Sequence, residues 1–266
     1  MKEIITIANQ KGGVGKTTTA VNLAASLAIA EKKVLLIDID PQANATSSLG
    51  FYKNDYEYNI YHVLIGAKEI DEVILNTTIE TLDLLPSNIG LVAIEKEFEQ
   101  LEHKEFTLKN VLSKIKDEYD YIIIDSPPTL GSITINALCA SESVIIPIQC
   151  EFFALEGVAQ LLNTVKLVKS SKNSRLQIKG ILPTMYTSQN NLAKQVLSDL
   201  VRHFGNKMFL DPESDKKRYL VIPRNVRLAE APSFGKPVAL YDIKSTGAVA
   251  YQKLAQSILG EKDGIR

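Results

Sequence analysis

IITIANQKGGVGKTTT, the sequence of residues 4–19, contains the features from which the rest of the chain can be understood. Residues 4–8 are mostly apolar, which is typical of a buried strand. Gly12, Gly13 and Gly15 follow and free the backbone. Next comes a segment in which apolar residues recur with the spacing of one helix face, namely Ala20, Leu23, Ala24, Leu27 and Ala28. Strand, glycine-rich turn and helix, in this order, form the context that a phosphate-binding loop requires.

The residue types in this loop suit phosphate groups. Glycines let backbone N–H groups converge on phosphate oxygens, and the helix N-terminus adds a favourable partial charge. Lys16 can reach the β- and γ-phosphates of a nucleotide, and the Thr17 hydroxyl can bind Mg²⁺. The strict pattern G-x-x-x-x-G-K-[ST] is not met, because Gln10 stands where its first glycine should be, and Lys11 leads the loop instead. The alternative interpretation is a glycine-rich helix entry that binds no ligand.

The sequence KGGVGKTT resembles the deviant Walker A loop of the ParA/MinD group of ATPases. The resemblance implies a P-loop NTPase that binds ATP and Mg²⁺. In that family the leading lysine crosses a nucleotide-sandwich dimer and contacts the partner's phosphates, so Lys11 is identified as this signature lysine and Lys16 as the lysine that acts in its own subunit. The nucleotide-binding loop implied in this way consists of Lys11, Gly12, Gly13, Val14, Gly15, Lys16, Thr17 and Thr18.

Length and composition are those of an ordinary globular protein. A chain of 266 residues suffices for one large α/β domain or two small ones. We expect a single P-loop ATPase domain over residues 1–266. Its fold class is α/β, with a mostly parallel, twisted central sheet flanked by helices on both faces. No apolar run approaches the roughly 20 residues of a membrane span, and no signal peptide precedes the first strand, so a cytoplasmic location is expected.

The two cysteines, Cys139 and Cys150, lack CxxC spacing, which argues against a disulfide framework or a zinc site. The nitrogenase iron proteins, relatives of this group, hold a cluster with two cysteines per subunit. Cys139 lies farther past the second switch than their ligand does, and the other ligand has no counterpart here. An iron–sulfur cluster is therefore not expected, and both cysteines are predicted to be small buried residues.

Charge is divided unevenly along the chain. Residues 1–150 carry 12 lysines, no arginine and 21 acidic residues, whereas residues 151–266 carry 18 basic and 10 acidic residues. This division hides behind a formal net charge of −1. A protein with such asymmetry can present a basic face to a polyanion. The alternative is a chance distribution over a solvated surface.

Aspartates follow two further apolar segments. Residues 34–37, VLLI, precede Asp38 and Asp40, and residues 121–124, YIII, precede Asp125. Parallel strands bring their carboxyl ends to one edge of the sheet, so these side chains are expected beside the phosphate loop. The resemblance implies that Asp40 orients the attacking water and that Asp125 is the Walker B residue. It also implies that Asp38 bonds either a Mg²⁺-bound water or the switch itself.

The expected metal set is thus Thr17, Asp38 and Asp125. For Asp38 in particular, a solvated turn at the end of a strand is the alternative interpretation. Residues 126–128, SPP, resemble the second switch of the family, which responds to the γ-phosphate. Glu151 resembles a family glutamate that reaches the ribose of a partner subunit.

The spacing of apolar residues predicts further elements. Short helices are expected over residues 60–65 and 70–75, and a strand over residues 82–85. Ile94, Phe98 and Leu101 share one face of a predicted amphipathic surface helix. Later helices are predicted over residues 133–140, 155–168, 192–204 and 246–259, with strands over residues 144–148 and 178–182.

Two later loops are expected to line the adenine, because they do so in relatives. Met185 would supply apolar contact, while Pro223 and Asn225 would supply backbone or side-chain hydrogen bonds. Arg224 would stack there or stabilise the loop. The guanine signature N-K-x-D is absent from the sequence, which favours ATP over GTP.

Basic residues gather in residues 202–236. Arg202, Lys207, Arg227 and Lys236 are the residues expected to contact DNA, the last two because partition ATPases have basic DNA-contacting residues at these places. Lysine and arginine contacts to phosphates give sequence-independent, salt-sensitive binding. The alternative is a set of charged loops on a solvated surface. Residues 210–219 are longer than the usual connection here, and nothing in the sequence assigns them a role.

The resemblance therefore implies a partition ATPase. It would dimerise with ATP, bind double-stranded DNA nonspecifically at the nucleoid, and hydrolyse ATP on stimulation by a ParB-type partner. A MinD-like membrane switch is the first alternative, but the last predicted helix is a poor basic amphipathic anchor, so stable membrane association is not expected. An ATP-dependent biosynthetic ligase, an iron–sulfur carrier and a binding scaffold without hydrolysis are further alternatives.

Overall fold

A seven-stranded sheet forms the centre of the computed structural model, which describes residues 3–99, 101–152 and 154–260. The strand order is β3-β4-β2-β5-β1-β6-β7. All neighbouring strands are parallel except β3, which pairs antiparallel with β4. The strands are β1 (Glu3–Ile7), β2 (Val34–Asp38), β3 (Leu75–Asn76), β4 (Leu82–Leu85), β5 (Tyr121–Asp125), β6 (Ser143–Gln149) and β7 (Gln177–Thr184). The predicted mostly parallel α/β sheet is confirmed.

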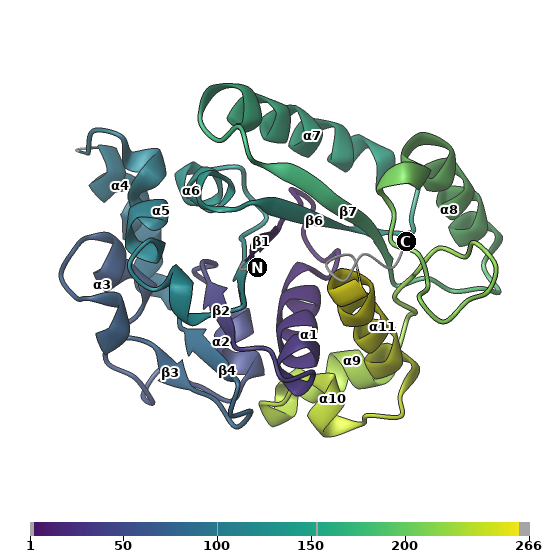
Figure 1. The fold of residues 1–266 in the computed structure, drawn as a ribbon, viewed down its shortest axis with the longest axis horizontal. Coiled ribbons are helices and arrows are strands. Elements are labelled where there is room, and N and C mark those ends of the chain that lie inside the picture. Colours follow the sequence, from purple (N-terminus) through teal and green to yellow (C-terminus); the bar gives the residue numbers. More distant parts are fainter. Residues whose placement is uncertain (1–2, 100, 153, 261–266) are drawn as a thin grey trace.

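Helices cover both faces of this sheet (Figure 1). Side chains alternate between the faces along each strand, so Ile5 of β1 packs in one apolar cluster while Ile4 packs in another. The first cluster joins the sheet to α1 (Lys16–Ile29) and α11 (Thr246–Gly260). On the other face pack α3 (Ile60–Leu64), α4 (Ile94–Glu99), α5 (Thr107–Leu112), α6 (Ser132–Ala140), α7 (Ala154–Ser171) and α8 (Asn191–Phe204).

The register of the central strands places two aspartates side by side. Asp125 at the end of β5 is the register partner of Ile7 in β1 and of Asp38 in β2. Because β1, β2 and β5 are adjacent and parallel, their carboxyl ends lie at the same edge of the sheet, where the glycine-rich loop leaves β1.

Two predicted helices between β2 and β5 are wrong in extent. The helix expected over residues 70–75 is a single 3₁₀ turn, η1 (Ile70–Glu72), and Leu75 instead pairs with Leu84 as part of β3. The amphipathic helix α4 ends at Glu99, so Leu101 lies outside it and is 46% exposed. Ile94 and Phe98 are buried as expected.

The remaining elements connect these layers. Helix α2 (Asn44–Ser48) follows β2, and α9 (Val226–Glu230) and α10 (Val238–Tyr241) precede α11. The other elements are 3₁₀ turns: η2 (Ile89–Ala93), η3 (Lys104–Phe106), η4 (Lys116–Glu118), η5 (Gly205–Lys207) and η6 (Ala231–Phe234). Among the residues described, none of the helices combines the length and the apolar character that crossing a membrane demands.

Residues 210–219, to which the sequence assigns no role, form a hairpin next to the outer edge of β7. Met208 forms an isolated parallel bridge with Ile181 of β7. Leu210 and Tyr219 then form an antiparallel bridge, so residues 209–220 fold back on themselves as a hairpin. Lys253 of α11 pairs with Asp211 and Glu213 of this hairpin, at 3.1 and 2.9 Å respectively.

Candidate functional site

The glycine-rich loop has the backbone that its sequence predicts. Gly13 and Gly15 adopt positive φ angles of 73° and 88°, which L-residues with a side chain rarely adopt. Gly15 is the residue immediately before α1, so the chain turns there directly into the helix. Lys16 and Thr17 are consequently the first residues of α1, and the free N–H groups of its first turn face the loop.

Side chains far away in the sequence hold this loop in place. The Asn9 amide donates to the Pro147 carbonyl oxygen at 2.7 Å and accepts a hydrogen bond from the Lys11 backbone N–H at 3.0 Å. At the other end of the loop, the Thr184 hydroxyl donates to the Val14 carbonyl oxygen at 2.8 Å. The sequence does not predict these roles for Asn9 and Thr184. Asn9 directly follows the strand predicted over residues 4–8, and Thr184 ends β7, two residues beyond the strand predicted over residues 178–182.

Lys16 is almost completely buried, with 7% of its surface exposed. Its Nζ donates to the Lys11 carbonyl oxygen at 3.1 Å, so the side chain folds back across its own loop. Burial lowers the pKa of the Lys16 ammonium, and the carboxylates of Asp125 and Asp40 oppose this shift. The ammonium therefore lies close to two predicted site aspartates.

Asp125 is the least satisfied polar group of the site. Its side chain is fully buried, and neither carboxylate oxygen makes a hydrogen bond of regular geometry to the described residues. Burial and then the neighbouring Asp38 raise the pKa of Asp125 well above its usual value, while interactions with Thr17 and Lys16 oppose the rise. Buried polar atoms without partners are rare in proteins and call for a ligand. The two oxygens, close to the Thr17 hydroxyl, fit the hard oxygen ligation that Mg²⁺ prefers.

Asp38 is equally buried, but both of its oxygens are engaged. One accepts the Asp40 backbone N–H at 3.0 Å, and the other accepts the backbone N–H and the hydroxyl of Thr46, at 2.9 and 2.8 Å. Burial raises the pKa of Asp38 to about 6, although these hydrogen bonds oppose the shift. Asp38 thus ties the segment that contains Asp40 and α2 to the end of β2.

Asp40 lies at the rim of the site with 7% of its surface exposed. One carboxylate oxygen accepts the Gln42 backbone N–H at 2.9 Å. The other accepts no hydrogen bond from the residues that the structure describes, and so can accept one from a ligand or water. Ser126, the first residue of the predicted second switch, donates its hydroxyl to the Ile7 carbonyl oxygen at 2.8 Å. The predicted phosphate and metal residues therefore converge at one edge of the sheet.

Lys11 points to a different partner. Its Nζ lies 3.7 Å from a carboxylate oxygen of Glu151, and both side chains are substantially exposed at 35% and 49%. The Gln149 amide also donates to Glu151, at 2.5 Å. Two residues that were expected to reach a partner subunit are thus neighbours at the open end of the loop.

The four residues expected around the adenine line one cavity of about 180 Å³, together with Gly15 and Thr18. Tyr186 joins the two loops, because its backbone N–H donates to Ile222 and its carbonyl oxygen accepts from Arg224, both at 3.0 Å. The Asn225 amide caps α9 by accepting the Arg227 N–H at 2.8 Å and donates to the Thr246 hydroxyl at 2.7 Å. Met185 has a positive φ of 51°, which indicates a backbone held in place by its surroundings.

The residues expected to contact DNA fall into two groups on different elements. Arg202 and Lys207 belong to α8 and η5, beside β7, whereas Arg227 and Lys236 belong to α9 and the connection from η6 to α10, beside α1 and α2 (Figure 1). The Arg227 guanidinium pairs with Glu230 at 2.8 Å and with Asp242 at 3.3 Å.

Both cysteines are buried, as predicted, and both are free thiols. Burial raises the pKa of the Cys139 thiol to about 11 and that of the Cys150 thiol to about 12. No group of three or more His, Cys, Asp or Glu side chains within the described residues is arranged to hold a metal ion by itself. A metal at this site would thus depend on Thr17, Asp125 and water.

Comparisons with known proteins find similar proteins over most of this chain. A family model described as an AAA domain matches residues 2–178. The sporulation initiation inhibitor protein Soj of Bacillus subtilis is 51% identical over 97% of this chain and 98% of Soj. The chromosome partitioning protein ParA of Myxococcus xanthus is 47% identical over 96% of this chain and 87% of ParA. The crystal structure of cobyrinic acid a,c-diamide synthase from Mycobacterium smegmatis with bound ADP and magnesium has a TM-score of 0.85 at 35% identity, covering 100% of this chain and 97% of the synthase.

Proposed function

The chain belongs to the AAA-domain ATPases of the Soj and ParA chromosome-partitioning type, and from this premise we propose that it is a Mg²⁺-dependent ATPase that segregates DNA. The observation that supports this activity best is the juxtaposition of a buried lysine and a buried, unsatisfied aspartate at the phosphate loop. Lys16 and Asp125 each carry a charge that burial disfavours. A magnesium nucleotide supplies the opposite charge to both groups.

Phosphate binding falls to the loop and to the start of α1. Backbone N–H groups of residues 12–17 and the α1 N-terminus donate to phosphate oxygens. The Lys16 ammonium can donate three hydrogen bonds, and one of them goes to the Lys11 carbonyl oxygen. The other two are available to the β- and γ-phosphates. Since the side chain is buried, it is already ordered before a nucleotide binds.

Thr17 and Asp125 are the residues proposed to hold Mg²⁺, Thr17 by its hydroxyl and Asp125 through the metal's water shell. The metal would neutralise charge that develops on the β- and γ-phosphate oxygens. Asp38 is proposed as part of the switch, because its oxygens already bind Asp40 and Thr46. This is the second of the two roles expected for Asp38.

Asp40 is proposed to orient the attacking water. Its carboxylate has one oxygen fixed by the Gln42 N–H, so the orientation of the group is set while the other oxygen can accept a proton of the water. Because Asp38 fixes the backbone of Asp40, a change in the loop from residue 40 to residue 46 would move this carboxylate.

Assembly is proposed to complete the site. Lys11 lies on the exposed rim, where it pairs with Glu151. An exposed ion pair contributes about 0–1 kcal/mol, so little free energy is lost when Lys11 leaves Glu151 and binds the phosphates of a partner subunit. The ATP dimer would bind double-stranded DNA nonspecifically, through Arg227 and Lys236 and through Arg202 and Lys207. Hydrolysis, stimulated by a ParB-type partner, would release the nucleoid-bound dimer. We treat residues 1–266 as a single domain.

No particular observation favours the MinD-like membrane switch or the ATP-dependent biosynthetic ligase, the two alternatives that share the ATP chemistry. The two partition proteins are 51% and 47% identical to this chain, whereas the diamide synthase is 35% identical. A membrane-bound switch would require an apolar face on α11 directed to lipid, but Tyr251, Leu254 and Ile258 of α11 are buried in the core.

The experiment that tests the proposal is DNA binding with ATP, with ADP and without nucleotide, each at low and high salt. We expect binding with ATP alone, weakening steeply as salt increases. Lys16→Ala serves as the control that should not bind nucleotide, so its DNA binding should not respond to ATP. Equal DNA binding in all three nucleotide states would overturn the proposed switch, and ATP-dependent pelleting with liposomes would favour the membrane alternative.

A further inference from the structure

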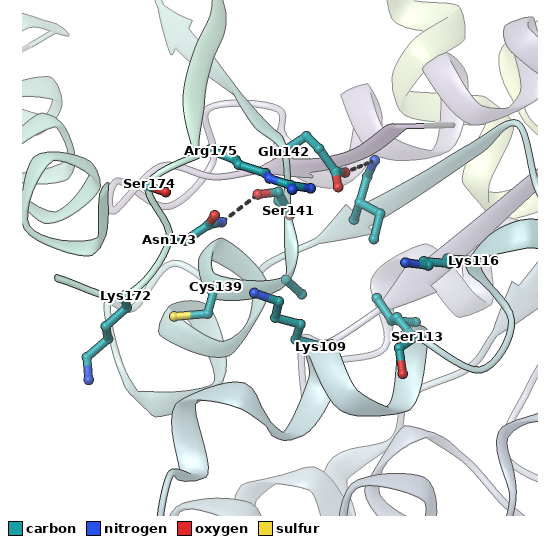
Figure 2. A pocket seen from close by; sticks show the side chains of 13 residues that line it. Lys109, Ser113, Lys116, Cys139, Ser141, Glu142, Lys172, Asn173, Ser174 and Arg175 are labelled. Carbon is teal, nitrogen blue, oxygen red and sulfur yellow. Dashed lines mark hydrogen bonds between the residues drawn. The ribbon is translucent and has the colours of Figure 1, made fainter. Parts of the chain in front are cut away.

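A second cavity, of about 360 Å³, lies away from the phosphate loop (Figure 2). It sits at the opposite edge of the sheet, where β6 and β7 begin and where α6 and α7 end. Its walls come from α5 and η4 on one side and from the connections that lead into β6 and β7 on the other. The lining residues are Ile4, Lys109, Leu112, Ser113, Lys116, Cys139, Ala140, Ser141, Glu142, Lys172, Asn173, Ser174 and Arg175.

Positive charge dominates this cavity. Figure 2 shows the Lys116 ammonium and the Arg175 guanidinium directed toward the common space, with the Lys109 ammonium at its side near Cys139, from three separate segments of the chain. The Lys109 ammonium also lies 5.7 Å from the centroid of the Phe106 ring. Lys172 points away, and its ammonium pairs instead with Glu105. Among the described residues, neither Lys116 nor Arg175 has an ion pair or a hydrogen-bonded partner.

Negative charge within the cavity is limited to one residue. Glu142 is the only acidic side chain among the lining residues, and its carboxylate accepts the Ile4 backbone N–H at 2.7 Å. The Ser174 hydroxyl adds a neutral polar group to the lining, whereas the Ser113 hydroxyl already donates to the Asn110 carbonyl oxygen at 2.7 Å. Three cations therefore face one partly engaged carboxylate in a concave surface, which concentrates a positive potential there.

Basic residues near helix C-termini often serve the helix itself, by binding its last carbonyl groups. Here another residue does so. The Asn173 amide donates to the carbonyl oxygens of Leu138 and Ser141, at 2.9 and 2.7 Å, at the end of α6. The Ser141 hydroxyl donates to the Ala137 carbonyl oxygen at 2.8 Å. The cationic groups of Lys109, Lys116 and Arg175 are thus not needed to cap α6.

We propose that this cavity, defined by Lys109, Lys116 and Arg175, is a binding site for a small molecule that carries two or more phosphate groups. Its volume exceeds what one phosphate fills, and the lysines and the arginine can each contact a different phosphate oxygen. The lining contains no aromatic side chain, so recognition rests on the phosphates and not on stacking of a base. This site is independent of the ATPase site and of the proposed function.

Inorganic pyrophosphate is the probe for the test. The protein is first saturated with Mg²⁺ and a non-hydrolysable ATP analogue, because the phosphate loop would otherwise bind pyrophosphate as well. Titration calorimetry then measures binding to wild type, Lys116→Ala, Arg175→Ala and the matched control Lys114→Ala. Lys114 is exposed and two residues from Lys116, but it pairs with Glu69 outside the cavity.

The expected result is one saturable site per chain, weakened about tenfold or more by Lys116→Ala and by Arg175→Ala and unchanged by Lys114→Ala. Titration of ADP in place of pyrophosphate distinguishes a nucleotide from a free polyphosphate: equal affinity indicates that only the phosphates are recognised. Absence of binding to the analogue-loaded protein overturns the proposal, as does an equal loss in Lys114→Ala.

A short DNA duplex provides the remaining arm. If the duplex competes with pyrophosphate and the same two variants lose DNA affinity, the cavity belongs to a DNA-binding surface, and the small-ligand proposal is wrong. Unfolding of each variant in urea confirms that a loss of binding is local. Since Lys116 and Arg175 are exposed and unpaired within the described residues, neither substitution is expected to shift the urea midpoint of unfolding measurably.

Discussion

Gly235 lies so close to Gly50 that a Cβ atom on Gly235 would be 2.6 Å from the Gly50 Cα. Both glycines have positive φ angles, 61° and 87°. Gly50 follows the segment that contains Asp38 and Asp40. Gly235 directly precedes Lys236, one of the residues proposed to contact DNA. Next to this contact, the Asn22 side chain of α1 accepts the Val238 N–H at 2.7 Å. The loop that would sense the nucleotide therefore touches the loop proposed to bind DNA, backbone to backbone.

Replacing Gly235 with alanine should cost more stability than the backbone angle alone explains. A positive φ costs an alanine about 1 kcal/mol, and the clash with Gly50 should add about 1–3 kcal/mol. Gly66→Ala is the matched control, because Gly66 has a φ of 73° and no neighbour within 4 Å of its Cβ position. Urea unfolding measures both variants, and equal losses would mean that the Gly50 contact relaxes freely.

Lys16→Ala should lower the affinity for ATP by about 100-fold or more, because it removes a buried charged donor from the phosphates. Equilibrium binding of a fluorescent ATP analogue measures the effect. Lys11→Ala is the informative contrast: its exposed ammonium is proposed to act on a partner's phosphates, so the monomer should still bind ADP while hydrolysis is lost. An affinity near that of wild type in Lys16→Ala would contradict the assignment of the loop.

Asp40→Ala should slow ATP hydrolysis by about 100-fold or more while leaving nucleotide binding intact, since the carboxylate is proposed to orient water and not phosphate. The expected consequence is a dimer that persists with ATP, which size-exclusion chromatography with light scattering detects. If the variant still hydrolyses ATP at the wild-type rate, Asp40 has another role.

Asp125→Asn should stabilise the metal-free protein by about 1–3 kcal/mol, because it removes a buried carboxylate whose oxygens make no hydrogen bond of regular geometry to the described residues. Burial raises the folded-state pKa of Asp125, and that of Asp38 to about 6. An acid with a raised pKa adds stability below its unfolded-state pKa, and this stability is lost as the pH rises through the folded-state pKa.

Metal-free wild type should thus lose stability between pH about 4 and pH about 7, and Asp125→Asn should lose less over the same range. Urea unfolding in a chelating buffer tests this, and repeating it with Mg²⁺ should narrow the difference between the two proteins. The same pH dependence in both would show that the charge of Asp125 is compensated in some other way.

Cys139 and Cys150 should resist alkylation in the folded protein. Their raised pKa values, about 11 and about 12, leave almost no thiolate at pH near 8, and both side chains are buried. Iodoacetamide followed by mass spectrometry should show labelling about 100-fold slower than in urea. Rapid labelling of either cysteine without denaturant would indicate local opening around α6 or β6.

Local patterns allowed the phosphate loop and the three aspartates to be found from the sequence, because strand ends and glycine turns are short-range features. The hydrogen bonds that hold the loop in place cannot be predicted in this way, because they join distant parts of the chain. Asn9 binds Pro147 and Thr184 binds Val14, across 138 and 170 positions of the chain. The contact of Gly50 with Gly235 is likewise invisible in either segment alone. The spacing of apolar residues predicts a helix over residues 70–75, whereas Leu75 pairs with Leu84 of β4, a contact that local spacing cannot reveal.

The sheet has little free edge to offer another strand. One outer strand, β3, is two residues long and antiparallel, and on the other side Met208 bridges Ile181 of β7. Short or covered edges protect a β-protein against cross-β aggregation. If copies of this chain gather on DNA as proposed, the short and covered edges disfavour irreversible strand pairing between them, so that reversible assembly through the phosphate-loop side meets no competition from fibril formation.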